Sequence, residues 1–210
     1  MAKIGIYGGI FNPVHFGHIG MAHWVLGHTN LDEIWMMVSP NNPLKDKSIL
    51  ADESIRLKGV KDAIAQLHIA DGKRLIASDF EFSLPRPTYT ADTLRCLQQT
   101  YPQHQFTLLI GEDNWRIFDR WKEYEFILQN FRIFVYPRHD IATVETCPEN
   151  LPDGFNDRST ISAINPRINV EHFDVKWMES APYFDISSTQ IRKAVSEGNE
   201  DVLKEWLDEK

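Results

Sequence analysis

The sequence is poor in cysteine, and this shortage excludes a disulfide-stabilised protein. Its two cysteines, Cys96 and Cys147, cannot form a disulfide framework, and no CxxC pattern is present. We therefore expect the chain to work in a reducing compartment, the cytoplasm.

Long apolar runs and an excess of positive charge are also absent. The longest apolar stretches fall far short of the roughly 20 residues that cross a bilayer. A strand-like pattern begins already at Lys3, so we expect no signal peptide. The formal net charge is -8, which argues against non-specific nucleic-acid binding but allows a small phosphate site. We expect neither a membrane nor a nucleic-acid partner, and the sequence leaves the oligomeric state open.

Short apolar runs alternate with amphipathic stretches along the 210 residues. Strands are predicted at residues 3–7, 33–38, 74–77, 106–110, 132–136 and 168–175. Helices are predicted at residues 16–28, 52–67, 90–99, 187–196 and 201–208, with a further helical region up to about 129. Residues 139–166 are rich in Pro, Asn, Asp and Gly and are predicted to form a long loop. The alternation predicts an α/β protein with a doubly wound parallel sheet.

The whole chain is expected to form one domain. Its α/β core is expected over about residues 1–180, and C-terminal helices over about residues 181–210.

A glycine-rich turn follows the first predicted strand and reads GGIFNPVHFGH from Gly8 to His18. It is neither a GxGxxG fingerprint nor a Walker A loop. Two glycines let the backbone approach a phosphate closely, and Asn12-Pro13 is a turn signal. The helix predicted to begin near Phe16 can turn its first amides toward an anion. Because ligands of open α/β sheets bind beyond the carboxyl ends of strands, this turn is a candidate phosphate site.

His15 and His18 are the candidate catalytic residues of this turn. They lie three positions apart, which puts both side chains on one side of the turn that enters the helix. Two imidazoles there can donate to phosphoryl oxygens as negative charge shifts in a transition state. A zinc site is disfavoured, because no HExxH pattern or nearby cysteine supplies further ligands. An ordinary pair of helix-start histidines is the remaining alternative.

A second candidate segment, ISSTQIRK from Ile186 to Lys193, opens a predicted helix near the C-terminus. Ser and Thr at a helix start either cap the helix or help its amides bind a phosphate. Arg192 follows Ser188 by four residues and therefore lies one turn later on the same face. Its guanidinium can hold two phosphate oxygens. Simple capping with a solvated Arg192 is the alternative for this segment taken alone.

Together the two segments resemble the HxGH nucleotidyltransferases, and more closely the bacterial nicotinate-nucleotide adenylyltransferases. The resemblance runs over almost the whole chain. It is carried by GGIFNPVHFGH, Pro40–Lys45, Thr88–Leu94, Ile110–Asp113 with Trp121 eight residues later, and ISSTQIRK. It implies a Rossmann-like fold and a reaction of NAD biosynthesis, in which ATP and nicotinate mononucleotide give deamido-NAD and pyrophosphate. Mg²⁺ would be carried mainly by substrate phosphates, and no protein ligand to the metal is predicted.

The resemblance also implies roles for individual residues. It implies a catalytic role for His15, His18 and Arg192. The implied ATP-binding residues are Gly8, Gly9, Ile10, Phe11, His15, His18, Ser187, Ser188, Thr189 and Arg192. The implied mononucleotide-binding residues are Asn12, Lys45, Tyr89, Thr90, Asp113 and Trp121. The indole of Trp121 can stack on the cationic pyridinium ring. The helix start at Tyr89-Thr90 can receive the nicotinate carboxylate.

The chain departs from the family pattern in three places. Ile10 stands where Ser or Thr is usual, Pro43-Leu44-Lys45 replaces the more usual Pro-Pro-His-Lys, and Lys122 follows Trp121 where some members have Tyr. Another HxGH adenylyltransferase, with nicotinamide mononucleotide or phosphopantetheine as acceptor, is the alternative function. A class I aminoacyl-tRNA synthetase fragment is disfavoured, because the chain has no KMSKS-like loop and no basic RNA face. A non-enzymatic nucleotide sensor is disfavoured because the candidate catalytic residues are all present.

Overall fold

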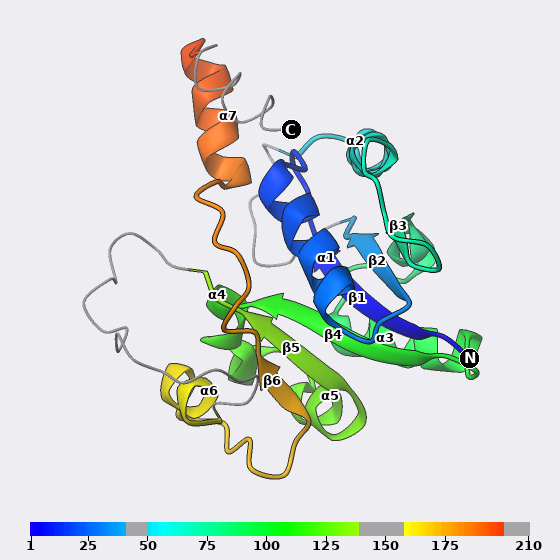
Figure 1. Ribbon diagram of the computed structural model, residues 1–210, viewed down its shortest axis with the longest axis vertical. Helices are drawn as coiled ribbons and strands as arrows, with labels where there is room; N and C mark the ends of the chain where they lie inside the picture. Colours follow the sequence, from blue (N-terminus) through cyan, green and yellow to red (C-terminus); the bar gives the residue numbers. More distant parts are fainter. Residues whose placement is uncertain (41–49, 139–157, 200–210) are drawn as a thin grey trace.

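The computed structural model describes residues 1–40, 50–138 and 158–199, and a six-stranded sheet lies at its centre (Figure 1). The strands are β1 (Lys3–Gly9), β2 (Glu33–Val38), β3 (Arg74–Ser78), β4 (Gln105–Gly111), β5 (Arg132–Tyr136) and β6 (Val175–Trp177). Their spatial order is β3-β2-β1-β4-β5-β6, and all neighbours run parallel. The chain winds outward in one direction from β1 and in the other from β4. Ligands of such sheets bind at this switch point, beyond the carboxyl ends of the strands.

Helices cover both faces of the sheet, as the predicted doubly wound fold requires. One face carries α1 (Phe16–His28) and α2 (Glu53–Ala65), and the other carries α3 (Thr90–Thr100), α5 (Tyr124–Asn130) and α6 (Arg158–Ile164). The short α4 (Glu112–Trp115) follows β4 directly, and 3-10 helices form at η2 (Phe80–Ser83) and η3 (Phe118–Arg120). The last described helix, α7 (Ser188–Glu197), stands beyond the sheet near the start of α1 (Figure 1).

Alternation along β1 divides the core into two halves. Ile4 and Ile6 pack into the cluster beneath α3 and α5, whereas Tyr7 packs into the cluster beneath α1. Burying one large aliphatic side chain contributes about 1.5–3 kcal/mol. The two clusters therefore stabilise the central strands. The loops at the carboxyl ends of these strands begin from fixed positions in the sheet.

Most of the predicted elements are confirmed. The bounds of α1, β2 and β5 are those predicted, and those of β1, β3, β4, α2, α3 and α7 differ by at most two residues at either end. Hydrophobic periodicity was sufficient to predict these elements, because each helix buries one regular face and each strand belongs to the buried sheet.

The predicted strand at residues 168–175 is wrong, because β6 begins only at Val175. Backbone turns precede it, with Ile168 N–H donating to the Asn165 carbonyl at 3.2 Å and Phe173 N–H donating to Val170 at 3.1 Å. Ile168 and Val170 are nevertheless buried in the core. Their apolar pattern is typical of a strand, although the backbone forms turns here.

The predicted loop at residues 139–166 is also partly wrong, because it contains α6. Ile161 is fully buried there, and its carbonyl accepts a hydrogen bond from Trp115 Nε1 at 3.0 Å. A helix this short shows too few turns for its periodicity to stand out. Residues 139–157, the predicted helix at residues 201–208 and the candidate Lys45 lie outside the described residues. In the parts that are described, no helix is long and apolar enough to cross a membrane.

Candidate active site

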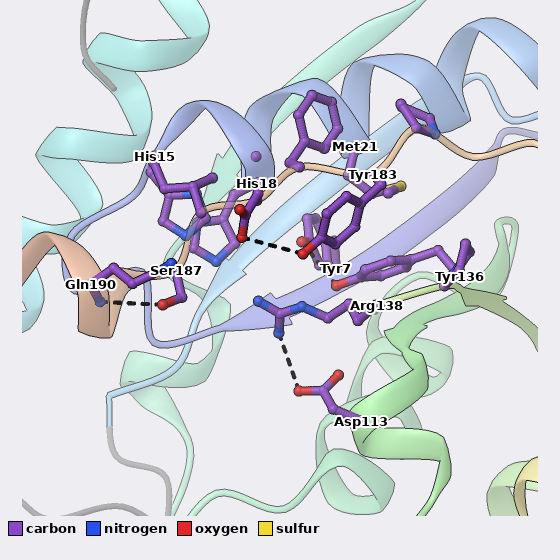
Figure 2. A pocket seen from close by; sticks show the side chains of 16 residues that line it. Tyr7, His15, His18, Met21, Asp113, Tyr136, Arg138, Tyr183, Ser187 and Gln190 are labelled. Atoms are coloured by element: carbon purple, nitrogen blue, oxygen red, sulfur yellow. Dashed lines mark hydrogen bonds and ion pairs between the residues drawn. The ribbon is translucent and has the colours of Figure 1, made fainter. Parts of the chain in front are cut away.

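Two pockets open at the carboxyl edge of the sheet. The first, of about 510 Å³, lies between the start of α1, the end of β5 and the segment that leads into α7 (Figure 2). Its lining includes Tyr7, His15, His18, Asp113, Tyr136, Arg138, Ser187 and Gln190. The second, of about 300 Å³, lies between β1, β4, α3 and the chain that follows α4. Its lining includes Gly8, Gly9, Ile10, Glu81, Tyr89, Thr90, Trp121 and Lys122.

The two candidate catalytic histidines, His15 and His18, lie together in the first pocket. His15 is only 6% exposed, and neither of its ring nitrogens has a hydrogen-bond partner within the described chain. Burial, assisted by the positive charge of Arg138, lowers the pKa of His15 to about 3. His15 is therefore neutral at pH 7. A neutral imidazole keeps one N–H, so His15 can donate one hydrogen bond to a ligand.

The start of α1 fixes the orientation of the two histidines. His15 has an extended backbone and immediately precedes the helix, and its carbonyl accepts hydrogen bonds from the His18 and Ile19 amides at 3.0 and 3.3 Å. The buried Phe11 packs edge-on against the His18 ring with a centroid distance of 5.0 Å. Because the first amides of a helix lack partners within it, this end of α1 favours a negatively charged ligand.

Two glycines of α1 let the chain that leads to α7 lie against the helix. A Cβ atom on Gly17 would come within 3.0 Å of Phe184 Cβ, and one on Gly20 within 2.5 Å of the Phe184 ring. Only glycine leaves room for this approach. The contact brings Ser187 and Gln190 to the side of the pocket that carries the histidines (Figure 2).

The late motif contacts the glycine-rich turn directly. Ser188 Oγ donates to the Pro13 carbonyl at 2.9 Å, and Arg192 Nη1 donates to the Asn12 carbonyl at 2.6 Å. Arg192 Nη2 donates to Thr189 Oγ1 at 3.0 Å. The two segments singled out in the sequence are therefore neighbours in the fold. Ser188 and Arg192 contact the turn, Thr189 contacts Arg192, and none of the three is in the lining of either pocket.

Arg138 is a residue of the first pocket that the sequence reasoning missed. Its Nη1 donates to Asp113 Oδ2 at 3.1 Å, and its side chain extends across the pocket toward the two histidines (Figure 2). Asp113, which the sequence assigned to the mononucleotide, thus lies in the pocket of the histidines. The available signal was the position of Arg138, two residues beyond the strand predicted at 132–136.

The second pocket brings together Tyr89, Thr90 and Trp121, three of the candidate residues for the mononucleotide. Tyr89 is the extended residue before α3, and Thr90 begins the helix. The Trp121 ring packs against Phe118 with a centroid distance of 5.1 Å. Lys122 Nζ lies 4.9 Å from the centre of the Tyr89 ring. The pocket thus combines a flat indole with a helix start and a nearby cation.

The glycine-rich turn also borders the second pocket. Gly8, Gly9 and Ile10, which the sequence assigned to ATP, contribute to its lining. Glu81 lines the same pocket and was missed, because nothing in its neighbourhood in the sequence marks it. It is 6% exposed, and burial raises its pKa although Thr93 Oγ1 donates to it at 2.9 Å.

A buried arginine of α2 holds the turn in place. Arg56 is 4% exposed and donates to the carbonyls of Ile10 at 2.6 Å and Ser39 at 2.8 Å. It also donates to Pro40 and Ala51. A guanidinium offers five donors, which suits it to bind several carbonyl groups at once. Arg56 thus fixes the glycine-rich turn to the end of β2.

Comparison with known proteins places this chain in a family. Residues 6–194 match the cytidylyltransferase-like family. A probable nicotinate-nucleotide adenylyltransferase of Bacteroides fragilis is 40% identical over 94% of this chain and 84% of its own length. One of Flavobacterium johnsoniae is 40% identical over 93% of this chain and 88% of its own.

Solved structures share the fold. The Plasmodium falciparum nicotinic acid mononucleotide adenylyltransferase complexed with NaAD superposes with a TM-score of 0.67 at 17% identity. The match covers 92% of this chain and 83% of that one. With the family match over nearly its whole length and relatives at 40% identity, the chain belongs to the nicotinate-nucleotide adenylyltransferases of the cytidylyltransferase-like family.

Proposed function

We propose that the chain transfers the adenylyl group of ATP to nicotinate mononucleotide, giving deamido-NAD and pyrophosphate. The observation that carries this proposal is the pair of pockets that meet at the switch point of the sheet. One of them has a helix start and two histidines suited to phosphates, and the other has an indole and a second helix start suited to a charged aromatic ring.

The first pocket takes the triphosphate of ATP in this proposal. A phosphate oxygen of the mononucleotide attacks the α-phosphorus, and the bond from this phosphorus to the β-phosphate breaks as pyrophosphate leaves. His15 and His18 donate to the phosphoryl oxygens, where negative charge shifts during the step. Ser187, Ser188, Thr189 and Arg192 hold the leaving phosphates. Arg192 then exchanges its bond to the Asn12 carbonyl for phosphate oxygens.

The second pocket takes the mononucleotide. The pyridinium ring stacks on Trp121, which adds a cation–π contribution of about 0.5–2 kcal/mol to the burial of its area. The carboxylate faces the amides at Tyr89 and Thr90, where α3 begins. An uncharged carboxamide gains less from this helix start and from the ammonium of Lys122. Nicotinate mononucleotide is therefore preferred over the amide.

Of the remaining candidates, Gly8, Gly9, Ile10 and Phe11 contribute the turn beside the phosphates, and Asn12 serves the mononucleotide. Asp113 lines the first pocket, so it would meet the mononucleotide at its phosphate end. Lys45 lies outside the described residues and is assigned to the mononucleotide from the resemblance alone. Magnesium enters with the nucleotide and is carried mainly by phosphate oxygens, since this ion keeps several waters and few protein ligands. Within the described residues, no three His, Cys, Asp or Glu side chains gather closely enough to hold a metal.

The test is pyrophosphate release from ATP with a panel of acceptors. Nicotinate mononucleotide, nicotinamide mononucleotide and phosphopantetheine are each supplied with Mg²⁺ to the purified chain. The proposal expects the highest kcat/KM with nicotinate mononucleotide. Efficient turnover of phosphopantetheine, or a preference for the amide, would replace the proposed acceptor by one of the alternatives.

A further inference from the structure

Two buried tyrosines lie at the boundary between the two pockets. Tyr7 comes from β1 and Tyr136 from the end of β5, and they are 5% and 6% exposed. They are the two side chains common to the linings of the first and second pockets. Their hydroxyl oxygens lie 3.1 Å apart. The tyrosine pair thus occupies the place where one cavity passes into the other.

The tyrosine pair has one more proton than its internal hydrogen bond uses. Either hydroxyl can be the donor within the pair, and that bond takes one of the two O–H protons. Burial raises the pKa of both Tyr7 and Tyr136, so both hydroxyls stay protonated at neutral pH. Within the described residues no other acceptor engages them, so the second proton is free to donate to a ligand.

Packing against neighbouring aromatic rings fixes the orientation of this donor. Tyr7 packs edge-on against Phe11 and Tyr136, with centroid distances of 5.8 and 6.0 Å, and its ring centre lies 6.4 Å from that of His18. A donor held by packing needs little reorganisation when charge develops nearby, and this favours stabilisation of a transition state. The guanidinium of Arg138 adds positive charge beside the pair.

We propose that the Tyr7–Tyr136 hydroxyl pair donates its second proton as a hydrogen bond to the phosphoryl group that passes from ATP to the mononucleotide. The inference rests on the proposed function, because the α-phosphorus must lie where the two substrates meet. In the step, the bond from the mononucleotide oxygen to the α-phosphorus forms, and the bond to pyrophosphate breaks. The tyrosine proton stays on its oxygen throughout. The pair therefore stabilises charge on an oxygen of the transferred phosphoryl group and takes no part in proton transfer.

Steady-state kinetics of Tyr7→Phe, Tyr136→Phe and the double variant test the proposal. Phe keeps each ring and removes one hydroxyl. The double variant has lost the donated proton and should lower kcat on the order of 10²-fold, as loss of one preorganised donor does. Each single variant keeps one hydroxyl, so its kcat should lie between those of the wild type and the double variant. KM for both substrates should stay within about twofold. Tyr101→Phe, a partly buried ring outside both pockets, is the matched control.

Thermal unfolding and calorimetric titration with ATP accompany the kinetics. The proposal expects folded variants that bind ATP normally and turn over slowly. Wild-type kcat in the double Phe variant, or a loss confined to stability or KM, overturns it. If the wild-type chain is inactive with nicotinate mononucleotide but active with another acceptor, the proposed function fails instead. The Phe variants are then compared on that acceptor, where the same loss in kcat still supports the tyrosine pair.

Discussion

The imidazole rings of His15 and His18 lie with their centres 3.6 Å apart and their planes inclined by 31°. Two imidazolium ions at this separation would repel each other strongly. The lowered pKa of His15 removes this conflict, since one ring of the pair stays neutral. A phosphate group that binds here then meets two donor groups without the cost of two adjacent cations.

His18→Ala should lower turnover on the order of 10²–10³-fold while ATP affinity changes little, because in the proposed mechanism His18 donates where charge develops in the transition state. The measurement is kcat by pyrophosphate release, with His23→Ala as the control from the exposed side of α1. Near-wild-type turnover of His18→Ala would remove this residue from the catalytic group.

His15 should make stability depend on pH in acid. Its pKa is about 3 when folded and 6.5 in the ordinary case, so below pH 6.5 the unfolded chain takes up a proton that the folded chain does not. The free energy of unfolding then falls by up to about 1.4 kcal/mol per pH unit as the pH drops from 6.5 toward 3. His15→Asn should flatten this dependence in urea unfolding between pH 6.5 and 4. An unchanged slope in the variant contradicts the lowered pKa.

Arg192→Ala should weaken the binding of ATP by about 1.5–3 kcal/mol, because the proposed charge-assisted contact to the leaving phosphates is lost. Titration calorimetry with ATP measures the effect. The neighbouring Lys193, whose side chain is 73% exposed, supplies the control variant Lys193→Ala. If only mononucleotide affinity falls, Arg192 serves the other substrate.

Trp121→Ala should raise the apparent KM for nicotinate mononucleotide several-fold and leave that for ATP nearly unchanged, because stacking contributes to one substrate only. Trp121→Phe, which keeps part of the packing against Phe118, should have an intermediate KM. Comparing both variants on both mononucleotides checks the assignment. Equal losses for ATP and the mononucleotide would indicate a structural role for Trp121.

Arg56→Ala should lower the free energy of unfolding by about 3 kcal/mol, because it leaves buried carbonyls without their charged donor. The exposed Lys58 lies on the same helix, and its pair with Asp62 is worth only about 0.3–0.5 kcal/mol. Urea unfolding of Arg56→Ala and Lys58→Ala measures the difference. Equal stability of the two variants would rule out the anchoring role of Arg56.

The sequence was sufficient to predict those helices and strands in which buried residues recur at a regular spacing. The helix from Phe16 and the histidines at its start were predictable because turn signals, glycines and apolar spacing agree there. Ile168 and Val170 were misleading, because burial inside turns produces the same apolar pattern as a strand. Local pattern alone does not separate the two.

The residues that the prediction missed owe their roles to contacts with residues that are far away in the sequence. Tyr136 belongs to a predicted strand, but its hydroxyl acquires a neighbour only when β5 comes to lie next to β4, with β1 beyond it. In the sequence, Arg56 looks like an exposed helix residue. Only in the folded chain does the glycine-rich turn lie against α2 and accept its hydrogen bond. The sharing of the glycine-rich turn between both pockets likewise depends on the strand order. No spacing within one segment encodes these relations.

The close fit of Phe184 over Gly20 has a consequence for how the chain tolerates change in length. Phe184 is held against α1, and Ser188 is held against the Pro13 carbonyl, so both ends of the short connector between them are fixed. An extra residue inserted after Phe184 would lengthen this non-helical connector by up to about 3.5 Å. The start of α7 would then shift from its contact with the Pro13 carbonyl, and the bond from Arg192 to the Asn12 carbonyl would be lost with it, while the sheet remained folded. Homologous enzymes can therefore vary in length elsewhere, but this connector should keep a constant number of residues.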